Sequence, residues 1–313
     1  MESSSPSNHV ITDVMSKHDL LRVLQWAAQE GWNPGRGDAD LFQMADPEGF
    51  FMSKTAEDGE PVAAVSAVRY GDNYGFIGLY ICANKFRGRG HGLTIFEHAM
   101  QHLEGRVIGL EAVAAQQSNY SKQGFVMAFE TVRVRGDLDV ALSSNPKVEQ
   151  EDGEGCGRHG LVLQAVNADD EDLVEMVSAY DELHTPAPRR GFTRAWLTAP
   201  GHIARVAIKD GVVKGYGVLR PCTTEGAKIA PLFASSVDVA EHLAREILSA
   251  ASVSCVPPPD KVFIDIPEPN KEGMLMAGRL GLSELWKCGR MYKGSAPKLP
   301  LDQIFGFTSL ELG

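Results

Sequence analysis

The chain has 313 residues, of which 43% are hydrophobic and 23% are charged, so it is long enough for two globular domains. Its net charge of −11 argues against a nucleic-acid-binding surface, because phosphate contacts need clustered Lys and Arg side chains. The five cysteines are scattered and odd in number, which excludes a disulfide framework and zinc-ligand spacing and is typical of a reducing compartment.

The N-terminal ten residues are rich in serine and polar, and they lack the basic stretch followed by an apolar run that marks a signal peptide. No apolar run in the sequence approaches the length needed to span a bilayer. We therefore expect a cytoplasmic protein that binds neither a membrane nor nucleic acid. The sequence leaves its oligomeric state open.

The first half of the chain alternates between helical and strand-like patterns. Apolar residues recur at helical spacing from Ser16, and a second short helix is expected at 40–44. Strand-like runs at 50–52, 62–70 and 74–83, separated by Gly/Asp turns, predict an antiparallel meander. A glycine-rich loop at 87–92 then precedes an expected helix at 93–103, a strand at 107–115, a short helix at 118–123 and a strand at 125–135.

The second half repeats this pattern after an acidic segment without apolar periodicity. Its expected elements are a helix at 169–180, strands at 204–208, 216–219 and 227–233, a helix at 237–250, a strand at 262–266 and a helix at 273–280. Residues 281–294 resemble 124–136, and 228–235 resemble 76–83, which indicates duplicated domains. We predict a disordered tail at 1–13, a domain at 14–136, a linker at 137–158 and a second domain at 159–313.

The segment with the clearest chemistry is the loop R-x-x-G-x-G, formed by Arg87, Gly90 and Gly92 between a strand and a helix. Glycines permit a close approach of the backbone to a ligand, and free amides at a helix start can hold a pyrophosphate. A dinucleotide fold would place the loop after the first strand of a parallel unit, and a P-loop would end in G-K-[ST]. The preceding meander and the ending His91-Gly92-Leu93 exclude both.

This loop after a meander resembles the acetyl-CoA motif of the GNAT N-acetyltransferase superfamily, and N-Y-S-K-Q-G-F at 119–125 is similar to that family's second signature. The resemblance covers residues 16–136. The segments E-G-W-N-P-G and F-G-F-T-S-L-E-L-G look like a subgroup with a second, degenerate GNAT-like domain. The implied fold is α/β (α+β), with two tandem domains that each have a mixed, mostly antiparallel sheet flanked by helices.

The resemblance implies that acetyl-CoA is the co-substrate and that no metal takes part. Tyr120 would protonate the departing thiolate. The expected acetyl-CoA contacts come from the strand before the loop, from the loop itself and from the second signature: Tyr80, Ile81, Cys82, Arg87, Gly88, Arg89, Gly90, His91, Gly92, Asn119 and Tyr120.

A carboxylate should also take a proton from the acceptor amine, because a protonated amine cannot attack. Glu111, on an otherwise apolar strand, is the first candidate, although it could instead pair with an arginine or face solvent. Asp38 is the second, because the resemblance places 32–40 at the acceptor pocket together with Trp32 and Asn33. Trp32 could equally be a core residue.

In the second half, Ser235 and Ser236 replace the glycine loop, and Asp238 would repel a phosphate, so this copy should not transfer an acyl group. It could close the acceptor site, and the polar segment 180–190 could reach a substrate or be a surface loop. The main hypothesis is an N-acetyltransferase for a small primary amine or amino-acid-like acceptor. A protein lysine or N-terminal acetyltransferase and a non-catalytic acyl-CoA-binding sensor are the alternatives.

Overall fold

The computed structural model describes residues 9–144 and 160–313 of the chain. The first half contains β1 (Val10–Val14), α1 (Lys17–Gln29), α2 (Asp38–Ala45), β2 (Phe50–Thr55), β3 (Pro61–Tyr70), β4 (Tyr74–Cys82), α3 (His91–His102), β5 (Val107–Ala112), α4 (Gln117–Lys122), β6 (Val126–Asp137) and α5 (Leu138–Ser143). The second half contains β7 (Leu161–Ala165), α6 (Glu171–Asp181), α7 (Arg190–Thr198), β8 (Ile203–Lys209), β9 (Val212–Pro221), β10 (Ala227–Ala234), α8 (Val237–Ser254), β11 (Lys261–Pro267), α9 (Lys271–Arg279), β12 (Ser283–Lys293) and β13 (Ile304–Gly306).

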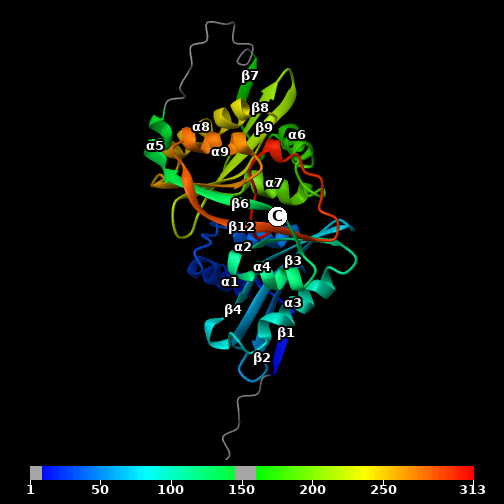
Figure 1. The fold of residues 1–313 in the computed structure, drawn as a ribbon. Coiled ribbons are helices and arrows are strands. Elements are labelled where there is room, and N and C mark those ends of the chain that lie inside the picture. Colours follow the sequence, from blue (N-terminus) through cyan, green and yellow to red (C-terminus); the bar gives the residue numbers. More distant parts are fainter. Residues whose placement is uncertain (1–8, 145–159) are drawn as a thin grey trace, which may run out of the picture.

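All the strands of the described residues belong to one twisted sheet that runs through both halves of the molecule (Figure 1). Its order is β1-β2-β3-β4-β5-β12-β6-β11-β10-β9-β8-β7, with β13 paired to β10. Neighbouring strands are antiparallel except in the pairs β4–β5 and β10–β11. The mixed, mostly antiparallel architecture predicted from the sequence is therefore confirmed, and β4 and β10 occupy equivalent places in the two copies.

The two halves exchange their last long strands. Strand β12 of the second half lies between β5 and β6, and β6 of the first half pairs with β11. The two exchanged strands also pair with each other, with Thr131 opposite Cys288 near the middle of the ladder. The predicted boundary at residue 136 therefore does not separate two closed sheets.

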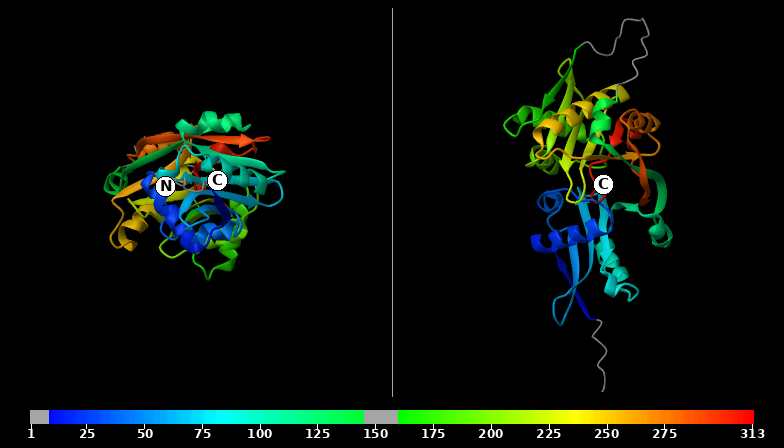
Figure 2. Two further views of the ribbon diagram at one scale, coloured as in Figure 1. Left: turned by 90° about the horizontal axis from the view of Figure 1, so that it is seen from below. Right: turned by 90° about the vertical axis from the view of Figure 1, so that its left-hand side faces the viewer.

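Helices cover both faces of the sheet, which is why β3 and β10 are almost entirely buried and read as continuous apolar runs. In the first half, α1 and α3 lie on opposite faces (Figure 2). The face of α1 and α2 continues into that of α6 and α7, so that one apolar core extends across both halves. Separate cores lie under α3 and under α8.

Two predictions about the connecting segments were wrong. Residues 10–13, predicted as part of a disordered tail, form β1, which pairs with β2 along its length. Residues 138–143, predicted as part of the linker, form α5, whose Leu138 and Ala141 pack into the core under α8. Both segments are too short to show a clear apolar periodicity, and their order comes from long-range packing. The remainder of the predicted linker lies almost wholly outside the described residues.

The second copy differs from the first between its two parallel strands. Strands β10 and β11 pair only through Ala227 and Lys228, and β13 then pairs with β10 in the opening beyond. On its other side, the segment that contains β13 is bound to β11, because the amide of Phe307 donates to the carbonyl of Asp265. The segment after β12 therefore fills the opening between β10 and β11. The equivalent opening in the first copy, between β4 and β5, remains free. Within the described residues, no helix is both long and apolar enough to cross a membrane.

Candidate active site

A cavity of about 560 Å³ opens where β4 and β5 separate. The two strands pair from Tyr74 and Val107 to Ile77 and Leu110, and beyond Leu110 β5 pairs only with β12 on its other edge. At the same point β4 carries a bulge against β3, and Leu79 adopts a left-handed φ of 44°. Such a conformation costs free energy for a leucine and is typical of ligand sites. The divergence exposes the backbone of 78–82 to the cavity.

The glycine-rich loop forms one end of this cavity. Gly88 and Gly90 have φ angles of 76° and 90°, which glycine adopts without strain, and helix α3 begins immediately after Gly90. No other group lies within 4 Å of the position that a Cβ would take at either residue, so the loop is open to a ligand. Unpaired amides in the first turn of α3 provide the partial positive charge that a pyrophosphate needs.

Arg87 is tied to both walls of the cavity. Its Nε donates to the carbonyl of Cys82 at 2.9 Å, and its guanidinium pairs with Glu30 at 2.5 Å. The side chain is half exposed, so its ion pair is weak and exchangeable. Arg87 can therefore turn toward a bound phosphate at low cost.

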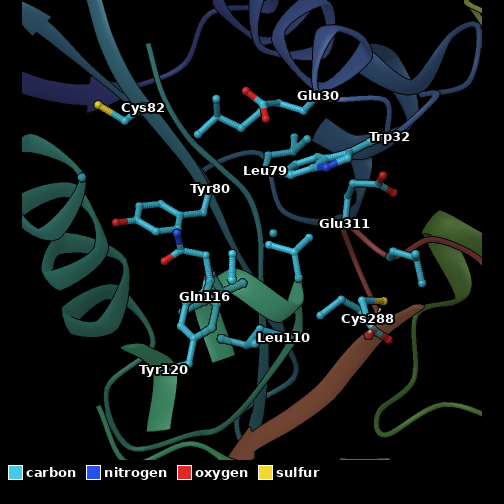
Figure 3. A pocket seen from close by; sticks show the side chains of 18 of the residues that line it. Glu30, Trp32, Leu79, Tyr80, Cys82, Leu110, Gln116, Tyr120, Cys288 and Glu311 are labelled. Atoms are coloured by element: carbon cyan, nitrogen blue, oxygen red, sulfur yellow. Dashed lines mark hydrogen bonds between the residues drawn. The ribbon is translucent and has the colours of Figure 1, made fainter. Parts of the chain in front are cut away.

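Tyr120, at the start of the second signature, lies on the opposite side of the cavity from Trp32 (Figure 3). Its ring packs among Tyr80, Phe96 and Phe125. Burial raises the pKa of Tyr120 above its ordinary value, so the phenol keeps its proton at neutral pH. A protonated, buried phenol at a cavity wall can donate a hydrogen bond to a developing thiolate.

Glu111 also faces the cavity, but both of its oxygens already accept hydrogen bonds. Oε1 accepts from Arg290 Nε at 2.7 Å and from Thr131 Oγ1 at 2.9 Å, and Oε2 accepts from Cys288 Sγ at 3.0 Å. Its side chain is 5% exposed. The structure thus places Glu111 at the predicted site and also in the arginine pair that was the alternative interpretation. Its acceptor positions are largely occupied, so it is less available as a base than a carboxylate with a free oxygen.

The segment 32–40 reaches the cavity only through Trp32 among its described residues. Asp38 is fully buried in an ion pair with Arg220 and accepts from the Gly35 amide at 2.7 Å. The Asn33 side chain accepts from the amide of Glu225 and donates to its carbonyl. The structure therefore does not place Asn33 and Asp38 at the acceptor pocket. Both fasten the first half to the second.

Of the remaining predicted acetyl-CoA contacts, some line the cavity and others lie outside it. Those that line the cavity are Tyr80, Ile81, Cys82, Arg87, Gly88, Gly90 and Gly92. Arg89 lies over the Phe86 ring, His91 packs edge-on against that ring, and Asn119 donates to Gln116 instead of facing the cavity. Burial raises the pKa of the Cys82 thiol, which agrees with a packed residue and not a nucleophile.

The sequence did not reveal several residues that line the cavity, and these come from the exchanged strands and from the C-terminal segment. They are Arg133 on β6, Trp286 and Cys288 on β12, and Leu310 and Glu311 in the segment after β13. Trp286 stacks on the Arg133 guanidinium, 4.5 Å from ring centre to Cζ. No local motif marks Arg133, Trp286 and Cys288, because β12 reaches the cavity only through the strand exchange. Leu310 and Glu311 lie in the segment F-G-F-T-S-L-E-L-G, which resembled the tandem subgroup but gave no sign that it lines the cavity.

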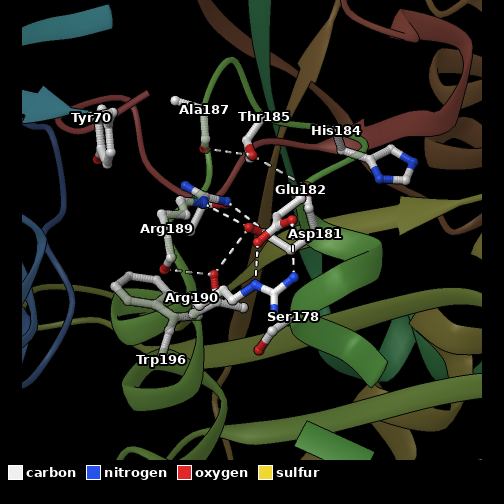
Figure 4. A network of polar contacts seen from close by, with 12 residues as sticks. Tyr70, Ser178, Asp181, Glu182, His184, Thr185, Ala187, Arg189, Arg190 and Trp196 are labelled. Atoms are coloured by element: carbon white, nitrogen blue, oxygen red, sulfur yellow. Dashed lines mark hydrogen bonds and ion pairs between the residues drawn. The ribbon is translucent and has the colours of Figure 1, made fainter. Parts of the chain in front are cut away.

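The polar segment 180–190 contributes a buried network instead of a substrate loop (Figure 4). Arg189 donates twice to Asp181, each time at 2.9 Å, and Tyr216 and Thr193 donate to the same carboxylate. Burial alone would raise the pKa of Asp181, but the Arg189 pair and these donors hold it below its ordinary value. Arg189 also donates to Thr308, so the network anchors the segment that carries Glu311.

Two family models match the chain. One described as "Acetyltransferase (GNAT) family" matches residues 17–126, and one described as "Acetyltransferase (GNAT) domain" matches 177–306. A relative named holothin acyltransferase, from Pseudoalteromonas sp. (strain SANK 73390), is 32% identical over 292 residues, or 93% of this chain and 90% of the relative. The chain therefore belongs to the GNAT acyltransferases and carries two GNAT domains in tandem. GNAT proteins in general use acetyl-CoA as the co-substrate.

Solved structures show the same fold. A putative acetyltransferase from Pyrococcus horikoshii aligns over 100% of this chain and 99% of its own, with a TM-score of 0.73 and 20% identity. A tandem GNAT protein from the clavulanic acid biosynthesis pathway aligns over 93% of this chain and 100% of its own, with a TM-score of 0.61 and 15% identity. At these identities the similarity establishes the two-domain fold alone.

Proposed function

We propose that this acyltransferase moves an acetyl group from acetyl-CoA directly to the primary amine of a small, amino-acid-like acceptor. One observation carries the proposal: a single cavity connects the glycine loop at 87–92 to a compartment lined by Trp286 and Leu310 of the second half. The loop suits a pyrophosphate, and the compartment suits a small acceptor.

In this reaction the backbone of 80–82 along the separated edge of β4 holds the pantetheine arm, and the loop amides hold the pyrophosphate. The amine nitrogen attacks the thioester carbonyl carbon, a C–N bond forms and the C–S bond breaks. Tyr120 donates a hydrogen bond to the leaving sulfur. Its raised pKa makes it a weaker acid than a thiol, so its main effect is to stabilise the thiolate until a proton arrives.

The compartment also weighs against the two alternatives. A protein lysine or N-terminal acetyltransferase needs an open groove for a peptide, whereas residues from both halves line this cavity. A non-catalytic sensor would not need a protonated phenol beside the expected sulfur. The relative's name makes holothin a candidate acceptor for this chain as well.

The test is a thiol-release assay with acetyl-CoA and longer acyl-CoA donors against holothin, small primary amines, amino acids and lysine peptides. The expected result is CoA release with a small amine and product mass corresponding to an added acetyl group. Release with peptides alone would favour the protein acetyltransferase. Tight acetyl-CoA binding without release for any acceptor would favour the sensor.

A further inference from the structure

Among the described residues, the contact between the two halves buries carboxylates near the cavity, and the partners of four of them differ. Three of them are paired with arginines: Asp38 with Arg220, Asp265 with Arg133, and Glu111 with Arg290. The fourth is Glu311, which is 5% exposed and lines the cavity. Within the described residues it forms no ion pair, although Arg133, Arg220 and Lys228 all act on it electrostatically.

Glu311 is held in place by its own segment. Ser309 Oγ donates to Glu311 Oε2 at 2.5 Å and also accepts from the Glu311 amide at 3.1 Å. Oε1 accepts no hydrogen bond from the described part of the protein, so one carboxylate oxygen is free to accept from a ligand. A positioned carboxylate with one free oxygen is the arrangement that general base catalysis needs.

The backbone of Glu311 fixes its distance from the expected reaction centre. Its carbonyl oxygen packs directly against Gly78, where a Cβ would overlap it, and Ser66 donates to the same oxygen at 3.4 Å. Gly78 immediately precedes the bulged Leu79, where β4 turns its backbone toward the cavity. Glu311 therefore sits beside the strand that would hold the thioester, next to Trp32 (Figure 3).

We propose that Glu311, supplied by the second half of the chain, binds the acceptor as its ammonium and takes the proton that the amine must lose. The inference rests on the proposed function and replaces Glu111 and Asp38 in this role. The proton passes from nitrogen to Glu311 Oε1, the nitrogen attacks the thioester carbon, CoA leaves and is protonated, and Glu311 returns its proton to solvent. The net products are the amide, free CoA thiol and one proton.

Glu311→Gln tests this with little change of volume and leaves an oxygen for Ser309. The expected result is a kcat at least about a hundredfold lower, with acetyl-CoA affinity and the thermal unfolding midpoint close to wild type. Glu311→Asp, which keeps the carboxylate, should recover part of the rate. Added formate should partly restore Glu311→Ala, because it can occupy the vacated site as a base. The matched control is Glu284→Gln, on the exposed part of β12, which should leave kcat unchanged.

A structural role gives different results. If Glu311 only balances the buried charge of Lys228, Glu311→Gln should lose stability, and activity should return in the double variant Glu311→Gln/Lys228→Met. Recovery in that double variant, or full activity of Glu311→Gln, would overturn the proposal while wild-type transfer still supported the proposed function. If wild-type protein transferred to no amine, the proposed function itself would fail.

Discussion

Gly78 and Glu311 are packed backbone to backbone, with no room for a side chain at residue 78. This contact joins the edge of β4 in the first half to the segment that follows β13 in the second. Gly78→Ala should therefore displace that segment and lower both stability and transfer. Overpacking of this kind typically costs about 1–3 kcal/mol.

Chemical denaturation and steady-state kinetics measure the two effects of Gly78→Ala. Gly191→Ala is the matched control, because a Cβ at Gly191 in α7 would meet no other group within 4 Å. It should be neutral or slightly stabilising, since alanine favours a helix over glycine. Equal stability of the two variants would show that the contact is loose.

The phosphate end of the cavity depends on Gly90. Gly90→Asp forces an L-residue into a φ of 90° and puts a negative charge where the pyrophosphate should lie. Calorimetry should show one acetyl-CoA bound per wild-type chain and none bound to this variant. One site is expected because β13 fills the matching opening of the second copy.

Gly105→Asp separates the effect of charge at the loop from that of backbone strain. Gly105 also has a left-handed φ, 81°, and open space around it, but it follows the far end of α3. Affinity should be retained in this control. Two molecules bound per wild-type chain would contradict the interpretation of the second copy as degenerate.

Tyr120→Phe removes the hydroxyl and keeps the ring that packs against Phe96 and Phe125. Turnover should fall by about a hundredfold or more, since the departing thiolate loses its hydrogen-bond donor. Acetyl-CoA affinity, measured by calorimetry, should be nearly unchanged. Turnover equal to wild type would mean that water or another group protonates CoA.

Local sequence was sufficient to predict most of the residues at the glycine-loop end of the cavity, although Arg89, His91 and Asn119 lie outside it. The glycines at 88, 90 and 92 and the tyrosine at 120 set the backbone and the wall of the cavity by themselves, and the structure brings them together. The capped start of α1 is also local, because Ser16 and Asp19 satisfy each other's backbone amides.

The acceptor end could not be predicted in the same way. Trp286 and Cys288 reach the cavity because β12 inserts between β5 and β6, and strand partners so distant in sequence leave no local pattern. Glu311 lies in the segment F-G-F-T-S-L-E-L-G, whose place against β4 depends on the packing of the two halves. Asp38 was misplaced because a fully buried carboxylate and a substrate-binding one have the same local sequence. Its partner, Arg220, lies on β9 of the other half.

Acid should destabilise the protein through His202. Burial lowers the pKa of His202 to about 4, and its Nδ1 lies 2.8 Å from the Trp196 carbonyl. The unfolded chain binds a proton near pH 6.5 whereas the folded chain resists it, so stability is full above that pH and falls as the pH drops toward 4. This residue should account for about 2 kcal/mol between pH 7 and pH 5.

Urea denaturation of wild type and His202→Gln at the two pH values measures this contribution. The loss between pH 7 and pH 5 should be smaller in the variant. His102 and His184, whose pKa values are also lowered by burial, remain in both proteins and account for part of the residual slope. An identical slope in the two proteins would assign the acid sensitivity to those histidines or to carboxylates.

Because the last strands are exchanged, the first half should not work alone. A chain ending at Ser144 would keep the glycine loop and Tyr120 but lose β12 from between β5 and β6, leaving two unpaired strand edges inside the sheet. It would also lose the α7 side of the continuous core and the Trp286 and Glu311 walls of the cavity. We expect this fragment to be insoluble, or to be soluble without measurable transfer.

Co-expression with residues 145–313 is the control, since the second fragment carries β12 and should restore a soluble, active complex. A soluble fragment with the wild-type KM for the same amine would show instead that the second half has no part in binding the acceptor.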